Sequence, residues 1–258
     1  MVSILDRVRG QSAPQPNEPE PEPEEFYKEM TLQEHLEELR QRLIFSLLAV
    51  AVGFVIGLAL AFPTMRLIVR MSGIERLYAI TPTESFITYT KVALYLGIGF
   101  AMPVIVYQIV RFLAPGLTRK ERRYLFRALP FVSVMFVSGV AFAFFVLVPR
   151  ALTFLSHFGG SVFEAQFRAE EVLSFYMTLL LWVGIVFELP IVIFILAKLN
   201  IVTAKRLASL RKFAILVIAV AAAMITPTPD PFNMFLVAAP MYLLYELGVL
   251  LARFAKPV

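Results

Sequence analysis

The chain has 258 residues, of which 59% are hydrophobic and only 17% are charged, and its mean hydropathy is +0.76. Soluble domains average about 45–50% apolar and about 25% charged residues, so this composition excludes an ordinary soluble enzyme. The net charge of +5 does not require a nucleic-acid partner, because basic cytoplasmic loops give a membrane protein the same balance. No cysteine is present, which excludes disulfides and thiolate chemistry.

The beginning of the chain differs from the rest in charge. Residues 1–42 contain 5 basic and 10 acidic residues, whereas residues 43–258 contain 19 and 9. Proline and glutamate alternate between Glu18 and Glu25, and such a segment cannot bury apolar surface. We therefore expect residues 1–30 to be a disordered, acidic cytoplasmic tail. Residues 31–254 would form a membrane domain, and residues 255–258 a short cytoplasmic C-terminal tail.

Six apolar spans follow this tail. Helical order is predicted to begin at Thr31, because Thr31 to Glu34 fits a capping box. Four spans have the roughly 20 residues that a bilayer requires, whereas the fifth has 13 and the sixth 18. By length alone, the last two could form a hairpin that enters the membrane without crossing it. The spans are Leu43–Phe62, Val92–Leu113, Ala128–Val148, Val172–Ala197, Phe213–Ile225 and Met234–Leu251.

The distribution of lysine and arginine predicts the orientation. Of the 24 basic residues, 18 lie in four segments that alternate spans would place on one side of the membrane: residues 1–42, 111–127, 198–212 and 252–258. The remaining 6 lie on the other side. Because basic loops stay in the cytoplasm, both termini are predicted to be cytoplasmic.

The segments on the outer side also have a predicted structure. Pro63 to Thr81 mixes apolar and charged residues, as expected of a helix that lies on the membrane interface. Thr81 to Glu84 fits a helix start with Pro82 as the first helical residue. Prolines inside the spans favour kinked helices, and these are Pro103, Pro130, Pro190 and Pro240.

Catalytic motifs are absent from the sequence. The two histidines, His35 and His157, are far apart, and no metal-protease, nucleophile-elbow or phosphate-loop motif occurs. We expect His157 to be a surface residue and Trp182 to face lipid or pack within its span. We therefore assign no catalytic residue, no metal and no cofactor.

Three carboxylates occupy positions that could matter for function. Glu38 lies four residues before Arg42, a spacing that stabilises a helix. Glu121 is the only acid among the basic residues of its loop, and with Thr118 it fits a capping box. Glu188 lies inside the fourth span, where an ionisable group costs roughly 2.5 kcal/mol or more and is a functional candidate.

Several motifs in the same order resemble the TatC family, the polytopic subunit of the twin-arginine protein translocase. The resemblance covers about residues 31–254. The matching stretches are His35-Leu36-Glu37-Glu38-Leu39-Arg40-Gln41-Arg42-Leu43, Phe112-Leu113-Ala114-Pro115-Gly116-Leu117 with Glu121-Arg122-Arg123, Phe187-Glu188-Leu189-Pro190, Thr226-Pro227-Thr228-Pro229-Asp230, and Pro240-Met241-Tyr242 with Tyr245-Glu246.

This resemblance implies a receptor with six transmembrane helices in a cup-like arrangement. The family recognises the paired arginines of signal peptides on folded cargo proteins. By motif position, Glu38 and Glu121 would hold the two guanidinium groups, with Arg40 and Phe112 nearby. Carboxylates suit this role, because each accepts bidentate hydrogen bonds from arginine.

The resemblance also implies partners and a location. Glu188 would be the family's intramembrane glutamate and Asp230 its outer-loop aspartate. The partners would be single-span subunits of the TatA and TatB types, in an oligomeric complex in the bacterial cytoplasmic (inner) membrane that is driven by the proton-motive force. The chain has Asn233-Met234 where the family would have a polar Ser-Gln pair, so a role for that glutamine is not transferred.

Two other classes of protein remain open from the residues alone. A secondary transporter for a small solute would need polar groups clustered in the membrane, and beyond Glu188 and Gln108 the spans contain few. A structural scaffold of another membrane complex would need only the helices and loops.

Overall fold

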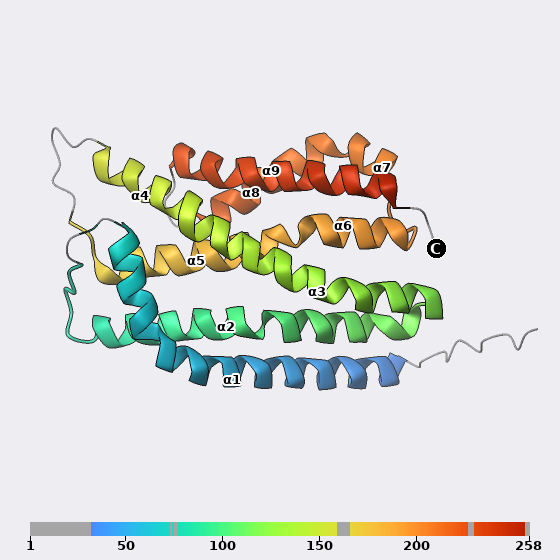
Figure 1. Ribbon diagram of the computed structural model, residues 1–258, viewed down its shortest axis with the longest axis horizontal. Helices are drawn as coiled ribbons and strands as arrows, with labels where there is room; N and C mark the ends of the chain where they lie inside the picture. The colour runs from blue at the N-terminus through green and yellow to red at the C-terminus, as the bar shows by residue number, and fades with distance from the viewer. Residues whose placement is uncertain (1–31, 73, 75–76, 159–165, 227–229, 256–258) are drawn as a thin grey trace, which may run out of the picture.

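The computed structural model describes residues 32–72, 74, 77–158, 166–226 and 230–255, and every regular element in these ranges is a helix (Figure 1). The predicted N-terminal tail and residues 256–258 lie outside the described residues. In chain order the elements are α1 (Leu32–Ser72), α2 (Glu84–Leu113), the 3₁₀ turn η1 (Ala114–Gly116), α3 (Arg119–Phe142), the π-helical segment η2 (Ala143–Leu147), α4 (Val148–His157), α5 (Ala169–Phe187), α6 (Leu189–Lys198), α7 (Ala204–Ser209), α8 (Arg211–Ile225) and α9 (Pro231–Phe254).

Within the described residues, five helical stretches are long and apolar enough to cross a membrane. They contain the first, second, third, fourth and sixth predicted spans, and they are Leu32–Ser72, Glu84–Gly116, Arg119–His157, Ala169–Lys198 and Pro231–Phe254. The predicted fifth span is α8, whose 15 residues reach only about 22 Å. The prediction that the fifth and sixth helices are short is confirmed, because α8 and α9 have 15 and 24 residues, whereas each of the first four stretches has 30 or more.

The helices run along one long axis, so their ends collect at two ends of the molecule (Figure 1). At the end that we call proximal, α1 begins, α2 turns into α3, α6 connects through α7 to α8, and α9 ends. At the opposite, distal end lie the connections from α1 to α2, from α4 to α5 and from α8 to α9. The described basic segments of the predicted cytoplasmic side therefore share the proximal end.

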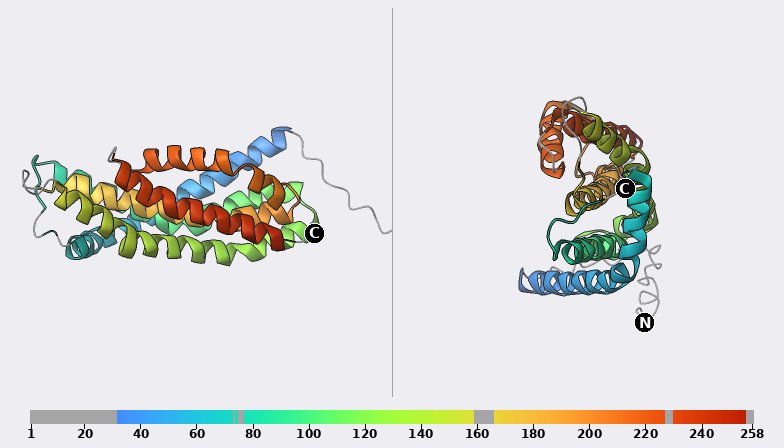
Figure 2. Two further views of the ribbon diagram at one scale, coloured as in Figure 1. Left: turned by 90° about the horizontal axis from the view of Figure 1, so that it is seen from above. Right: turned by 90° about the vertical axis from the view of Figure 1, so that its left-hand side faces the viewer.

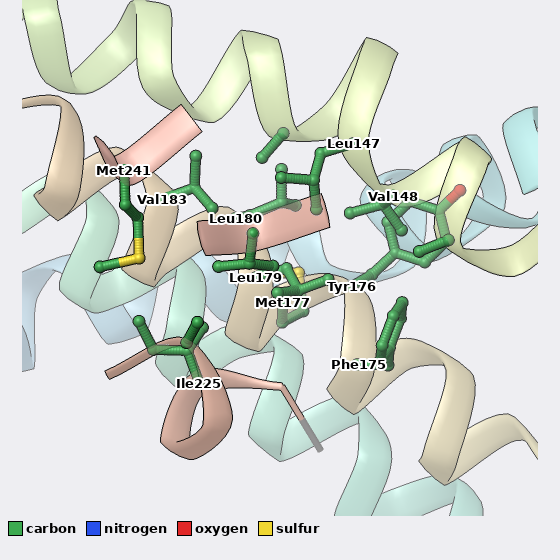
Figure 3. Packing of buried hydrophobic residues seen from close by; sticks show 14 of the residues in the cluster. Leu147, Val148, Phe175, Tyr176, Met177, Leu179, Leu180, Val183, Ile225 and Met241 are labelled. Atoms are coloured by element: carbon green, nitrogen blue, oxygen red, sulfur yellow. The ribbon is translucent and has the colours of Figure 1, made fainter. Parts of the chain in front are cut away.

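Seen along this axis, the helices follow a curve on which α1 and α8 project to the same side (Figure 2). Helix α5 lies between them and provides much of the core, including the fully buried Tyr176 and Leu173. Figure 3 shows side chains of α5 packed against Leu147 of η2 and against Met241 of α9. The central position of α5 explains why its sequence is apolar on nearly every face.

The first two helices pack in unusually close contact. Gly53 of α1 faces Gly97 of α2, and Gly57 faces Ala93, so that a Cβ atom added at either α1 glycine would collide with the opposite backbone. Small residues four apart allow two helix backbones to approach in this way. This antiparallel contact, which we call the α1–α2 seam, fixes the register of the two helices.

Two predictions for the outer segments are wrong in their boundaries. Helix α1 does not end at Phe62 but continues through Pro63 and bends across the distal end (Figure 1). The predicted interfacial helix ends at Ser72 rather than Thr81, because Tyr78 pairs with a distant segment instead: its N–H donates to the Phe167 carbonyl at 3.0 Å.

The helix start predicted at Thr81 is shifted to Glu84. The Glu84 carboxylate still accepts from the Thr81 N–H at 3.4 Å, as a capping box requires, but it also accepts from the Ile80 N–H at 2.9 Å.

Prolines interrupt some spans and leave others intact. Pro103, Pro130 and Pro240 lie inside continuous helices. Pro190 follows the break between α5 and α6, since proline has no N–H to continue the helical ladder. The π-helical segment η2 ends at Leu147, two residues before Pro149, and such segments occur as single-turn interruptions of α-helices.

Candidate functional site

The proximal end brings together the segments that contain the predicted site residues. The ring of His35 on α1 stacks on the ring of Phe112 at the end of α2, with centroids 4.4 Å apart and planes 24° apart. The chain then passes through η1 and starts α3 within a few residues. The start of α1, the end of α2 and the start of α3 therefore lie at one face of the molecule (Figure 1).

Glu38 forms the helix-stabilising pair that its spacing predicts. The Arg42 Nη2 donates to Glu38 Oε1 at 3.0 Å, and the two side chains are only 13–14% exposed. Glu38 Oε2 and Arg42 Nε are buried, and neither has a hydrogen-bond partner within the described part of the chain. The pair is thus buried but incompletely satisfied.

Glu121 forms the predicted capping box at the start of α3. Its Oε2 accepts from the Thr118 N–H at 2.8 Å and from the Thr118 hydroxyl at 2.9 Å, and Thr118 Oγ1 accepts from the Glu121 N–H at 3.3 Å. The side chain is partly exposed. Both candidate acids therefore have local structural partners, while both lie at the proximal end.

The other two predicted site residues surround these acids. Arg40 is exposed, and its guanidinium lies 3.4 Å from the Glu37 carboxylate. Phe112 is half-buried in its stack with His35. On α3, the Arg122 guanidinium lies 5.8 Å from the centroid of the Phe126 ring.

Glu188 lies at the break between α5 and α6. It is only 8% exposed, and its Oε1 has no hydrogen-bond partner among the described residues. An intramembrane carboxylate without an internal partner is a candidate for contact with another polypeptide or with water.

Asp230 begins α9, where its role is partly structural. Its Oδ1 accepts from the Asn233 N–H at 2.7 Å and its Oδ2 accepts from the Asn233 side-chain amide at 2.9 Å. Asn233 is almost fully buried. The asparagine that departs from the family pattern therefore completes the cap of α9.

A network of charges at the distal end is not predicted by the sequence patterns. Arg168 Nε donates to the fully buried Glu84 at 3.1 Å, and Lys91 donates to Glu170 at 2.6 Å. The hydrogen bond to Glu84 raises the pKa of Arg168. These partners are 84 and 79 residues apart, so no local pattern could pair them.

A second missed pair joins α8 to α9 at the proximal end. Arg211 donates two hydrogen bonds to Glu246, at 2.7 and 2.8 Å, and the Tyr242 hydroxyl donates to the same carboxylate at 2.9 Å. Tyr242 and Glu246 belong to one of the motifs in the sequence, but no local pattern identifies Arg211, 35 residues from Glu246, as their partner.

The remaining single residues behave as expected. His157 is exposed and its ring nitrogen lies 2.8 Å from the Thr153 carbonyl, and Trp182 is also exposed. Among the residues that the structure describes, no group of three or more His, Asp or Glu side chains could hold a metal ion.

Comparison with known proteins agrees with this arrangement. Residues 34–240 match the family model described as "Sec-independent protein translocase protein (TatC)". The TatC of Carboxydothermus hydrogenoformans is 40% identical over 232 residues, which cover 89% of this chain and 96% of that protein. The TatC of Koribacter versatilis is 37% identical over 91% of this chain and 89% of that protein.

The chain belongs to the TatC family. A crystal structure entitled "Twin Arginine Translocase Receptor- TatC" superposes with a TM-score of 0.77 at 34% identity, covering 86% of this chain and 99% of the solved one. A second crystal structure of the receptor, in DDM, superposes with a TM-score of 0.78 at 34% identity. Like other TatC proteins, this chain is a multi-pass membrane protein and a component of protein transport.

Proposed function

We propose that this TatC protein is the receptor of its translocase and binds the twin-arginine signal peptides of folded cargo proteins at the proximal end. The observation that supports this most strongly is the presence of two glutamates at one face. Glu38 comes from α1 and Glu121 from α3, and each could receive one guanidinium. Arg40 and Phe112 line the same face.

Recognition would rely on geometry more than on net charge. Basic residues at the end of α2 and in α3 flank Glu121 in the sequence, and they would repel a peptide that is merely cationic. Exposed ion pairs contribute only about 0–1 kcal/mol each, so selectivity requires two acids and bidentate bonds. Lysine lacks the planar fork of arginine, so the Kd of a twin-lysine peptide should be at least about tenfold higher than that of a twin-arginine peptide.

This function requires the proximal end to face the cytoplasm. The charge distribution supports that orientation, since 18 of the 24 basic residues belong to the predicted cytoplasmic segments. The bacterial relatives support a location in the cytoplasmic (inner) membrane, and with the proximal end inside, both termini would be cytoplasmic.

Partner subunits would bind within the membrane. Glu188 is buried at a helix break without an internal partner for Oε1 among the described residues, and a polar residue of a single-span subunit of the TatA or TatB type would satisfy it. Asp230 would orient the outer end of α9. In this role the receptor assembles an oligomeric translocase that uses the proton-motive force.

Crosslinking tests the proposal directly. A photoreactive twin-arginine signal peptide should crosslink to purified protein in vesicles, and Glu38→Gln should abolish the crosslink while the protein stays folded. Arg253→Gln, a change of one exposed charge at the same end, is the control and should bind normally. Equal crosslinking of twin-arginine and twin-lysine peptides to the unmodified chain would exclude the function.

A further inference from the structure

The carboxylate that the proposed function assigns to a ligand arginine is already occupied by an arginine of the receptor. Arg42 Nη2 lies 3.0 Å from Glu38 Oε1, and the two side chains are only 13–14% exposed. A peptide guanidinium therefore meets a filled site. The following inference rests on the proposed function and concerns the regulation of the same site.

The internal pair is weaker than the pair that a ligand could form. An arginine and a carboxylate at best make two parallel hydrogen bonds, but Arg42 and Glu38 make one. Glu38 Oε2 and Arg42 Nε remain without partners among the described residues. Each buried group left unsatisfied carries a desolvation cost, so this pair holds the carboxylate without using its full capacity.

The α1–α2 seam places a third unsatisfied group beside the pair. Gly53 faces Gly97 across the seam. Arg42 lies eleven residues before Gly53 and Gln108 eleven residues after Gly97, about three helical turns on each antiparallel helix. The register therefore sets Gln108 opposite Arg42.

Gln108 provides an unused hydrogen-bond acceptor for the Arg42 guanidinium. It is only 8% exposed, and its Oε1 has no hydrogen-bond partner within the described part of the chain. A carbonyl oxygen is an acceptor for a guanidinium. The seam thus contains an acceptor that the empty site leaves unused.

We propose that Arg42 is an internal substitute for the ligand, which exchanges with an arginine of the signal peptide. In the empty receptor Arg42 compensates the buried charge of Glu38. On binding, the peptide guanidinium takes both oxygens of Glu38, and Arg42 turns to the Oε1 of Gln108. The exchange replaces the single hydrogen bond between Arg42 and Glu38 with a bidentate pair between the peptide and Glu38. It also gives the Gln108 carbonyl oxygen a hydrogen-bond donor.

This exchange also increases selectivity. An arginine ligand can replace Arg42 with a pair of at least equal geometry, whereas a lysine offers no fork and must displace a guanidinium to make a point contact. Lysine therefore competes against Arg42 at a disadvantage that a vacant carboxylate would not impose. Removing Arg42 should raise affinity and reduce discrimination together.

Peptide binding to the full chain in detergent tests the exchange. Arg42→Gln should lower the Kd for a twin-arginine peptide by about fivefold, the factor expected from losing one competing hydrogen bond. It should also lower the ratio of twin-lysine to twin-arginine Kd values. Arg253→Gln removes one charge at the same end and should change neither value. Unchanged or weaker binding in folded Arg42→Gln would overturn the exchange.

A double-mutant cycle gives an independent test. Gln108→Met should weaken binding when Arg42 is present, and should have no effect in the Arg42→Gln background. An equal effect in both backgrounds would contradict the exchange. If Arg42→Gln does not fold, Arg42→Lys decides: it keeps the charge without the fork and should bind the twin-arginine peptide more tightly than the unmodified chain, and an unchanged Kd would overturn the proposal.

Failure of the exchange is distinguishable from failure of the proposed function. Glu38→Gln tests the site itself. Loss of binding in Glu38→Gln together with no change in Arg42→Gln would reject only the exchange, whereas normal binding in Glu38→Gln would reject the assignment of Glu38 and the exchange with it.

Discussion

The two ends of the molecule hold their charges in opposite ways. At the distal end, Glu84 pairs with Arg168 across 84 residues and Lys91 with Glu170 across 79. At the proximal end, Glu38 pairs with a residue four positions away, and Glu121 with one three positions away. Distal pairs fasten separate segments to each other, whereas the proximal acids are held by their own helices. Losing the partners of the proximal acids would therefore not separate distant segments of the fold.

The α8–α9 corner limits this contrast. Arg211 and Glu246 also lie at the proximal end, yet they join two helices through a bidentate pair. This corner is separate from α1 and α3, which contribute the candidate acids. The contrast with the distal end therefore applies to the face formed by the start of α1, the end of α2 and the start of α3, and not to the whole proximal end.

The largest effect is expected from breaking the distal network. Arg168→Ala leaves the fully buried Glu84 without its cation, which should cost about 3–5 kcal/mol of stability. Thermal unfolding in detergent measures the loss. Arg150→Ala removes an exposed arginine of α4 and is the control. If both variants unfold at the same temperature, the distal network does not fasten the fold.

The seam that connects the two ends should be nearly as sensitive. Gly57→Ala places a Cβ against the Ala93 carbonyl, and such overpacking costs about 1–3 kcal/mol. Gly99→Ala is a matched control, because no atom lies within 4 Å of its added Cβ. Equal stability of the two variants, again measured by thermal unfolding, would show that α1 and α2 can move apart at the seam without cost.

The sequence predicts the local pairs of the proximal acids but not the long-range pairs of the distal end. Hydrophobic length identified the spans, and spacings of three and four identified the Thr118 cap and the Glu38–Arg42 pair, since both depend only on helix geometry. Glu84 looked like a simple helix start. Its pairing with Arg168 depends on how distant segments meet, and that information is not local.

The same limit explains the errors at Pro63 and Tyr78. Proline normally ends a helix, but α1 continues through Pro63 because its far side packs against other elements, with Ile68 fully buried. The backbone pairing of Tyr78 with Phe167 likewise overrides the helical pattern of its segment.

A smaller loss of stability is expected from removing the cap of α3, and comparing two variants separates this cap from the charge of Glu121. Thr118→Ala removes the capping hydroxyl and should cost about 1 kcal/mol. Glu121→Gln keeps an oxygen that accepts the Thr118 N–H, and its stability should be close to that of the unmodified chain. A large destabilisation by Glu121→Gln would mean that the charge itself is needed for the fold.

The smallest effect is predicted for the acidic tail. Residues 1–28 have no apolar periodicity, so their deletion should leave membrane insertion and cargo export near normal. Export of a twin-arginine reporter from cells measures this. A protein that no longer accumulates after the deletion would show that the tail contacts the membrane domain.

The discrimination between twin-arginine and twin-lysine peptides by Glu121→Gln tests the central claim most directly. This variant preserves the cap of α3 but removes the charge, so a structural role and a recognition role give different results. We expect Glu121→Gln to stay folded and to lose its preference for the twin-arginine peptide. Normal discrimination in Glu121→Gln would contradict the claim that the proximal acids recognise paired arginines.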